Sequence, residues 1–235
     1  MSYQALARVY DGFFEADYHE KILRRYRRIL QDFGVADGNI LDMGCGTVRL
    51  AIYFAGLGAR VCGVDPDEAM LTCAREKSQG MEIEWHRGRL HEIEGEGRFD
   101  AITASLDVIN HITCENEVLD SFCAARRLLR RGGVFVFDVN TEKKFREVYA
   151  DRSYIFRKDD ALAAWENDYD EKRELCRFTV DVFTKTDGGY ERKTDIIHER
   201  MYRDETIRRM LKMAGFGRIL RQGMDHGTRH IYIAK

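Results

Sequence analysis

The segment Ile40-Leu41-Asp42-Met43-Gly44-Cys45-Gly46-Thr47-Val48-Arg49 carries the strongest structural signal in the sequence. A short apolar run leads into two glycines, and a helical pattern follows them. Glycine lets a backbone turn sharply and approach a ligand without a Cβ clash. The segment therefore predicts a strand that turns into a helix, with a ligand bound at the turn.

A second signal follows after about 20 residues, where an apolar run ends in Val61-Cys62-Gly63-Val64-Asp65. A carboxylate at the end of a strand can accept both hydroxyls of a ribose. A dinucleotide loop would need a third glycine where Arg49 stands, so that a pyrophosphate could approach the helix. Asp42, just before the glycines, would repel a phosphate but suits a ligand with an ammonium and a sulfonium group. Together these residues predict an adenosine ligand that carries positive charge.

Short apolar runs alternate with helical stretches through the first part of the chain. The expected strands are Asn39–Met43, Arg60–Val64, Glu82–His86, Phe99–Ala104 and Gly133–Val139. The expected helices between them are Arg49–Leu57, Asp67–Lys77 and Glu115–Arg130. Such alternation predicts an α/β fold with a doubly wound, mostly parallel seven-stranded sheet and right-handed crossovers.

The pattern changes after Asn140. Three segments alternate polar with apolar residues and predict a small antiparallel sheet of three strands: Ala161–Asp168, Glu174–Thr184 and Tyr190–Arg203. The turn TDGGY (186–190) favours a tight hairpin. A helix over Asp204–Ala214 and a final antiparallel hairpin, Phe216–Gln222 with Arg229–Ala234, complete the chain.

Three parts of the chain are therefore expected. Residues 1–34 form an N-terminal helical lid, residues 35–140 and 204–235 form the ligand-binding core, and residues 141–203 form an antiparallel β insert on the acceptor side.

Four motifs in this order resemble those of class I (Rossmann-like) S-adenosylmethionine-dependent methyltransferases, of the compact bacterial methyltransferase-domain type. They are LDMGCGTVRL (41–50), VCGVDPDEAML (61–71), FDAITASLDVINHI (99–112) and RRLLRRGGVFVFDVN (126–140). The resemblance covers residues 39–140, and the C-terminal helix and hairpin fit the usual end of the family. It implies S-adenosyl-L-methionine as the cofactor.

The resemblance also implies roles for particular residues. Gly44, Cys45 and Gly46 would line the methionine and ribose through their backbone, and Asp42 would orient the amino-acid end. The other implied cofactor contacts are Asp65 with the ribose, Pro66 and Met70 with the adenine, the backbone of Arg89 and Leu90 with the adenine, the Leu106 carbonyl with the ammonium, and Tyr3 and Tyr10 in the lid.

The chain departs from the family pattern at three positions. Val48 stands where a third glycine is usual, Arg89 where an acid commonly contacts the adenine, and Arg131 where a proline often precedes Gly-Gly. Val48 and Arg89 are the basis for one alternative, a regulatory protein that binds S-adenosylmethionine without turnover.

Methyl transfer is a displacement at a carbon already activated by positive sulfur, so the protein must mainly align the two reactants and exclude water. A general base is needed only for an acceptor that arrives protonated. Asp107, Asn110 and His111, after the fourth strand, are the catalytic candidates. The alternatives are helix capping by Asp107 or Asn110 and simple packing of His111.

Acceptor-binding candidates lie at Asn140, Trp165 and His198, with Phe178 and Tyr190 in the same insert. The alternative for the insert residues is the apolar face of its sheet. A small molecule is the expected acceptor, and RNA modification of the tRNA type is the alternative enzyme function. The sequence lacks the Asn/Asp-Pro-Pro motif of DNA adenine methylases, because Pro66 is its one proline.

Composition limits the choice further. The 235 residues carry a formal net charge of −2, which gives no general attraction to nucleic acid or membranes. The six cysteines form no Cys-x-x-Cys pair, so no metal site is expected. No apolar run is long enough to span a bilayer, and the N-terminal residues do not resemble a signal peptide. A cytoplasmic location is expected, and a homodimer is compatible with the sequence.

Overall fold

A seven-stranded sheet forms the centre of the computed structural model, which describes residues 5–7, 16–158 and 160–235. Its strands are β1 (Asn39–Met43), β2 (Arg60–Asp65), β3 (Ile83–Arg87), β4 (Phe99–Ala104), β5 (Leu129–Asn140), β10 (Ile219–Met224) and β11 (Arg229–Ala234). Their order is β10-β11-β5-β4-β1-β2-β3. The pairs among β1–β5 are parallel, and β11 is antiparallel to β5 and β10. The predicted α/β sheet with its C-terminal antiparallel hairpin is confirmed.

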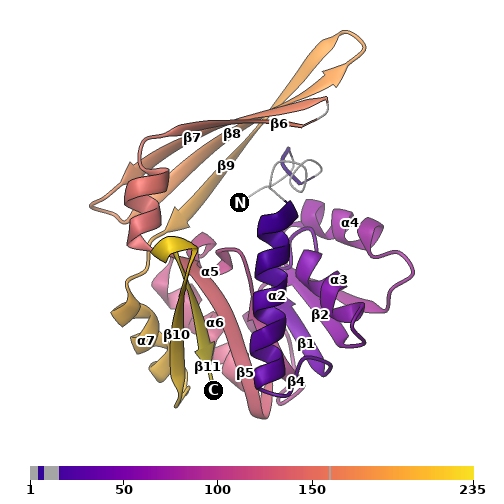
Figure 1. Cartoon of the computed structure of the whole chain (residues 1–235), viewed down its shortest axis with the longest axis vertical. Coiled ribbons are helices and arrows are strands. Elements are labelled where there is room, and N and C mark those ends of the chain that lie inside the picture. Colours follow the sequence, from indigo (N-terminus) through magenta and orange to yellow (C-terminus); the bar gives the residue numbers. More distant parts are fainter. Residues whose placement is uncertain (1–4, 8–15, 159) are drawn as a thin grey trace.

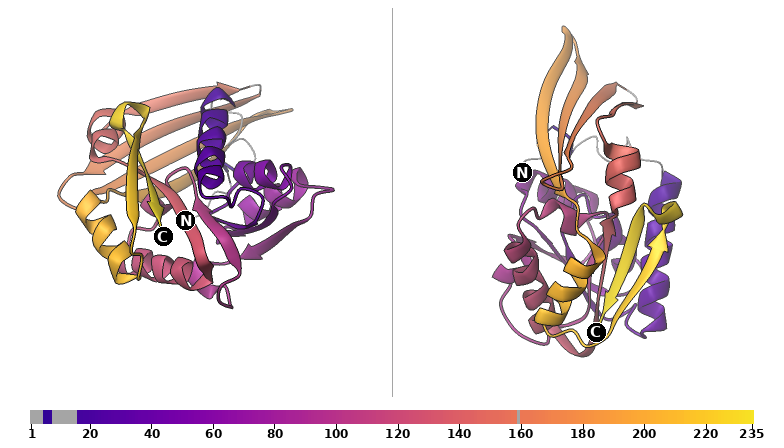
Figure 2. Two further views of the ribbon diagram at one scale, coloured as in Figure 1. Left: turned by 60° about the horizontal axis from the view of Figure 1, so that its bottom comes forward. Right: turned by 90° about the vertical axis from the view of Figure 1, so that its left-hand side faces the viewer.

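Helices cover both faces of this sheet (Figures 1 and 2). One apolar core holds residues of α2 (Ala16–Asp32), α3 (Arg49–Ala55) and α4 (Glu68–Lys77), and the other holds residues of α6 (Glu115–Leu128) and α7 (Asp204–Met213). Neighbouring side chains of a strand point to opposite faces, so Ile40 belongs to the first core and Leu41 to the second.

A second, antiparallel sheet lies over the carboxyl ends of the central strands (Figure 1). It consists of β6 (Ser153–Lys158), β7 (Ala161–Asp170), β8 (Leu175–Thr186) and β9 (Gly189–Arg200), in that order. The expectation of three strands was wrong because β6 was missed. Only its first four residues alternate between exposed and half-buried positions, and two charged residues end it, so its period-two signal is short.

Four short helices near the ends of core strands were also not predicted. They are η1 (Leu90–Glu92) after β3, α5 (Val108–His111) after β4, the π-helix η2 (Lys144–Tyr149) after β5, and η3 (Asp225–Gly227) before β11. Each is too short to show a helical period in the sequence. The predicted helix Glu115–Arg130 ends at Leu128, because β5 already begins at Leu129.

Helix α2 packs against the central sheet along most of its length. Ile22, Tyr26, Ile29 and Leu30 are buried in the core that it shares with α3. Only its first turn reaches the carboxyl ends of the strands, and Tyr3 and Tyr10 of the expected lid lie outside the described residues. No helix in the described ranges combines the length and apolar character needed to cross a membrane.

Candidate active site

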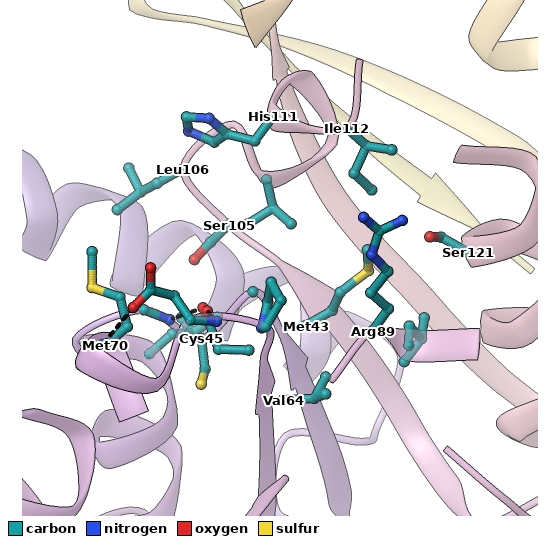
Figure 3. Close-up of a pocket in the computed structure, with 18 of the residues that line it drawn as sticks. Met43, Cys45, Val64, Met70, Arg89, Ser105, Leu106, His111, Ile112 and Ser121 are labelled. Carbon is teal, nitrogen blue, oxygen red and sulfur yellow. Dashed lines mark hydrogen bonds between the residues drawn. The ribbon is translucent and has the colours of Figure 1, made fainter. Parts of the chain in front are cut away.

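A cavity of about 280 Å³, here called the glycine-loop cavity, opens at the carboxyl ends of β1, β2 and β4 (Figure 3). Its wall includes nine of the residues that the sequence analysis connected with a cofactor: Gly44, Cys45, Gly46, Asp65, Pro66, Met70, Arg89, Leu90 and Leu106. The strand ends thus bring together residues that are up to about 60 positions apart, as open α/β sheets commonly do.

The loop after β1 is shaped by left-handed backbone conformations. Gly44 has φ +63°, and a Cβ there would lie 2.6 Å from the Val108 side chain. Gly46 has φ +51°, with only the carbonyl of Gly44 near its missing Cβ. Only glycine adopts such angles without strain, so the loop backbone can form a cradle open to a ligand.

Val48 occupies the position where the resemblance would place a third glycine. Its φ of 74° is left-handed, which is unusual for a β-branched residue and strains the backbone. The side chain is fully buried in the core that contains α2 and α3. Packing against that core therefore holds a conformation that the side chain alone would disfavour.

Asp65 closes the other side of the loop. Its Oδ2 accepts the Gly46 N–H at 2.9 Å, and its Oδ1 accepts the Asp67 N–H at 2.9 Å. Burial raises the pKa of this carboxyl, although the two N–H groups act in the opposite direction. Each oxygen keeps a further lone pair, so the carboxylate can accept hydroxyl donors from a ligand in the cavity.

Asp42 lies beneath the loop and is not among the residues that line the cavity. It is 2% exposed and accepts the Thr103 hydroxyl at 2.9 Å. Burial, with the nearby Asp65 as a smaller cause, raises the pKa of the Asp42 carboxyl to about 7. Its negative charge is therefore costly until a positive group approaches.

Arg89 pairs with an acid that the sequence analysis did not select. Its guanidinium lies 2.6 Å from the carboxylate of Glu117 in α6, and both residues line the glycine-loop cavity. The family's usual acid after the third strand is thus absent from position 89, but Glu117 brings a carboxylate to the same region from another element.

A second cavity of about 240 Å³ lies between the core strand ends and the antiparallel sheet, and we call it the inter-sheet cavity. It is lined by Tyr18, His19, Leu106, Asp107, His111, Lys144, Val148, Tyr149, Tyr154, Phe156, Trp165, Asn167, Ile197, Glu199 and Arg229. His19, Leu106 and His111 line both cavities, so the two adjoin at these residues. In Figure 3, His111 and Leu106 lie above Cys45 and Met70, which line the glycine-loop cavity.

The turn between β4 and α5 is held by buried charges. Leu106 and Asp107 both have positive φ, and both of their N–H groups donate to the Asp138 carboxylate, at 2.9 and 3.0 Å. Arg229 of β11 pairs with Asp138 and, at 3.1 Å, with Asp107. This network fixes a strained turn at the junction of the cavities, where such strain often accompanies function.

Asn140 connects this network to the antiparallel sheet. Its amide nitrogen lies 2.8 Å from the Asp107 carboxylate and 2.9 Å from that of Glu199 in β9. The Tyr149 hydroxyl is also 2.9 Å from this nitrogen, so the two N–H groups are shared among three acceptors. The residue is fully buried behind the cavity wall, so it positions both carboxylates.

The charges at the junction set the protonation of three groups. Burial alone would raise the pKa of Asp107, but Arg229 and His111 hold it well below its usual range. Burial alone would lower the pKa of His111, but the neighbouring Asp107 carboxylate and the charge of Glu199 raise it. Burial and then the Asp107 charge raise the pKa of Glu199 to about 7. Of these three groups, only His111 also lines the glycine-loop cavity, so it is the one placed to exchange a proton at the junction.

The ligand atoms of Asp107, His111 and Glu199 all lie within 4.8 Å of one another, a spacing that could hold a metal ion. Asp107 is already paired with Arg229, whose fixed positive charge opposes a cation at this place. We therefore treat the group as a proton-transfer and positioning cluster.

The other predicted residues take different places. The Asn110 side chain is buried and bonded to the backbone of Asn140 and Arg200, so it ties α5 to β5 and β9 and lines neither cavity. Trp165 lines the inter-sheet cavity, and Phe178 packs behind it. His198 alternates with Ile197 and Glu199 along β9, so its side chain faces away from the cavity.

Several residues of the inter-sheet cavity had no signal in the sequence. Lys144, Tyr149, Glu199 and Arg229 line the cavity, and the sequence did not predict a role for any of them. Tyr190, a predicted candidate for acceptor binding, is instead 66% exposed and does not line it. A polar residue on a strand is usually a solvated one, so Glu199 could be recognised only through the strand period. On that basis Glu199 shares a face of β9 with the buried Ile197.

Comparison with known proteins adds independent findings. Residues 40–133 match a family model described as a methyltransferase domain. The chain is 28% identical over 218 residues to YqeM of Bacillus subtilis (strain 168), a protein named as a methyltransferase, covering 92% of this chain and 87% of that protein.

Solved structures of methyltransferases share this fold. An S-adenosylmethionine-dependent methyltransferase from Clostridium acetobutylicum ATCC 824 superposes with a TM-score of 0.86 at 25% identity, covering 99% of this chain and 98% of that one. The S-adenosylmethionine complex of CalS10, an amino pentose methyltransferase from Micromonospora echinaspora, gives a TM-score of 0.76 at 20% identity, with 98% and 96% covered.

Proposed function

We propose that this chain, a class I S-adenosylmethionine-dependent methyltransferase, transfers the methyl group to a small molecule bound in the inter-sheet cavity. One observation carries the proposal. The glycine-loop cavity and the inter-sheet cavity adjoin at Leu106 and His111, so a donor in the first and an acceptor in the second would meet there.

The residues of the glycine-loop cavity fit the cofactor. The backbone of Gly44–Gly46 would hold its methionine and ribose, and Asp65 would accept the ribose hydroxyls. Pro66 and Met70 would pack on the adenine, whose edge would meet the backbone of Arg89 and Leu90. The Leu106 carbonyl would accept the ammonium, and the buried Asp42 beneath the loop would favour the positive charge of the amino-acid end. When bound, S-adenosylmethionine supplies a methyl group on positive sulfur.

His111 is assigned the role of general base for an acceptor that arrives protonated. It lines both cavities, and its Nε2 lies 3.6 Å from the Asp107 carboxylate. Asp107 stays ionised and holds the imidazole, which would take the proton that the acceptor atom loses on methylation. The bond between the methyl carbon and sulfur would break at the same time, and S-adenosylhomocysteine would be the leaving group. Asn140 and Asn110 act as positioning residues.

The lining of the inter-sheet cavity supports a small acceptor. Aromatic side chains form much of the wall, and the antiparallel sheet covers it. An RNA substrate would instead need an open mouth with gathered cations. The likeness to CalS10, which methylates an amino pentose, fits a small molecule as well.

Binding and turnover test this proposal in sequence. Isothermal titration calorimetry should show saturable binding of S-adenosylhomocysteine to the purified protein, and Asp65→Ala should weaken that binding by at least about tenfold. A library of small acceptors is then screened for S-adenosylhomocysteine release. With an acceptor found, His111→Gln should lower kcat by about 100-fold or more while leaving cofactor binding unchanged. Equal turnover by His111→Gln would contradict the role of His111.

A further inference from the structure

Lys144 lies in the wall of the inter-sheet cavity, at the start of a π-helical turn. It is the first residue of η2, whose π-helical hydrogen bond runs from the Ala150 N–H to the Phe145 carbonyl at 2.7 Å. Ala150, which ends this turn, has φ 39°. π-helical turns and strained residues recur at functional sites. The wide turn places both Lys144 and Tyr149 on the cavity wall.

The ammonium group of Lys144 has no hydrogen-bond or ion-pair partner in the described ranges of the chain. It makes a cation–π contact with the Tyr149 ring, whose centroid is 5.4 Å from the Lys144 nitrogen. The next lysine differs. Lys143 donates to the His226 carbonyl at 3.0 Å and lies 3.9 Å from the Glu147 carboxylate on the surface.

The carboxylates of the same cavity are already engaged. Asp107 accepts from Arg229 and Asn140, and it is close to His111. Glu199 accepts from Asn140 and, at 3.4 Å, from the Tyr149 hydroxyl. By contrast, the buried Nε of Arg229 has no hydrogen-bond acceptor. Among these charged side chains, Asp107 and Glu199 therefore have protein partners, whereas the Lys144 ammonium has neither a hydrogen bond nor an ion pair with any described residue.

Lys144 and His111 differ in which cavities they line. His111 and Leu106 line both cavities, whereas Lys144 lines only the inter-sheet cavity. An acceptor in the inter-sheet cavity that reaches the methyl donor beside His111 could place a second group beside Lys144. The aromatic side chains of Tyr154, Phe156 and Trp165 lie on the wall of the same cavity.

We infer that the acceptor carries an anionic oxygen group, a carboxylate or a phosphate, which the Lys144 ammonium binds while an apolar ring lies against the aromatic wall. The inference rests on the proposed function of the inter-sheet cavity and names the chemical class of its ligand. An ionised oxygen group makes stronger hydrogen bonds to an ammonium than a neutral group does.

The electrostatic surroundings support this assignment. Burial, and next the charge of Arg229, lower the pKa of the Lys144 ammonium, while Asp107, Glu199 and Asp225 act in the opposite direction. The acids nearby thus do not fully offset the desolvated positive charge. A bound anion would offset it.

Probes with one ring and different head groups test the inference. Benzoate, phenyl phosphate, benzamide and benzylamine are titrated by calorimetry into protein saturated with S-adenosylhomocysteine. Benzoate or phenyl phosphate should bind at least about tenfold more tightly than benzamide, and the better of the two identifies the anion. Lys144→Met should remove this preference. Lys143→Met, the matched control on the neighbouring residue, should keep it.

Each other outcome contradicts the inference. Tighter binding of benzylamine would show that Asp107 or Glu199 selects a cationic acceptor. Absence of saturable binding by both anions, or an unchanged preference in Lys144→Met, would also overturn it. Lys144→Gln, with a thermal melt of each variant, guards against misfolding. Failure of S-adenosylhomocysteine to bind the wild-type protein is a separate result, and it would reject the proposed function itself.

Discussion

The two cavities that meet at His111 are built in different ways. The glycine-loop cavity is shaped mainly by backbone, through left-handed glycines and strand ends that lie next to one another in the central sheet. The inter-sheet cavity is shaped by side chains from seven or more separate segments, held in place by buried charges around Arg229.

The difference shows which physical forces each cavity depends on. Backbone shape is sensitive to added volume, because a single Cβ can fill the space that a ligand needs. A network of buried charges is sensitive to the loss of one partner, because the remaining charge is left in a medium of low polarity. Substitutions in the two regions should therefore have effects that can be told apart.

Removal of the central cation should have the largest effect. Arg229→Met leaves the buried carboxylates of Asp107 and Asp138 without their counter-ion, and we expect a loss of about 3 to 5 kcal/mol of unfolding free energy. Urea denaturation measures it. Arg221→Met is the control, since this more exposed arginine pairs with Asp204 at 3.2 Å and should cost about 1 kcal/mol or less. Equal losses in both variants would contradict the comparison.

A methyl group added to the glycine loop should mainly weaken the binding of the cofactor. Gly44→Ala places a Cβ 2.6 Å from Val108 in a left-handed backbone, so the loop must shift. We expect S-adenosylhomocysteine to bind about 100-fold more weakly in calorimetry. Gly58→Ala is a matched control, because Gly58 is also left-handed, with φ +93°, but has no atom within 4 Å of the added Cβ. Unchanged binding by Gly44→Ala would argue against this loop as the cofactor cradle.

Asp42 links the glycine loop to charge effects on stability. Its pKa of about 7 in the folded chain lies above the usual 3.8, so the folded state holds the proton more tightly. The free energy of unfolding should therefore fall as pH rises from about 4 to about 7. Asp42→Asn keeps the acceptor for Thr103 and should be about 2 kcal/mol more stable than wild type at pH 8, without this gain at pH 4. Thermal melts of the cofactor-free proteins at both pH values measure it.

The smallest predicted effect concerns the junction of the two cavities. The pKa of His111 should lie above its usual value of 6.5, because Asp107 and Glu199 outweigh the effect of burial. Asp107→Asn should lower it by about one unit, equivalent to about 1.4 kcal/mol. Proton NMR titration of the imidazole measures the shift, with His111→Gln used to assign the signal. A pKa that does not respond to Asp107→Asn would remove the charge coupling from the proposed mechanism.

Most of the fold could be predicted because it follows local periodicity. All seven strands of the central sheet were expected, since buried parallel strands form short apolar runs between helical stretches. Strand β6, helix α5 and the π-helix η2 were not. Each is short, and tertiary contacts stabilise it. For example, the turn just before α5 is held in place because the N–H groups of Leu106 and Asp107 donate to the Asp138 carboxylate in β5.

The two cavities of the candidate site also differ in how far the sequence predicted them. The residues of the glycine-loop cavity lie in contiguous motifs, because a loop that follows a strand is shaped by the residues next to it in sequence. The inter-sheet cavity includes Lys144, Glu199 and Arg229, which belong to three different elements. Nothing local in the sequence indicates that Arg229 lies against Asp107, 122 positions away.

The sequence by itself therefore determined the central sheet, the glycine loop and the acid at position 65, because these depend on short-range patterns of apolar residues and glycines. Only the tertiary structure decided how the inter-sheet cavity is built. Its charges act through space between segments far apart in the chain, and their partners and protonation depend on burial that folding alone creates.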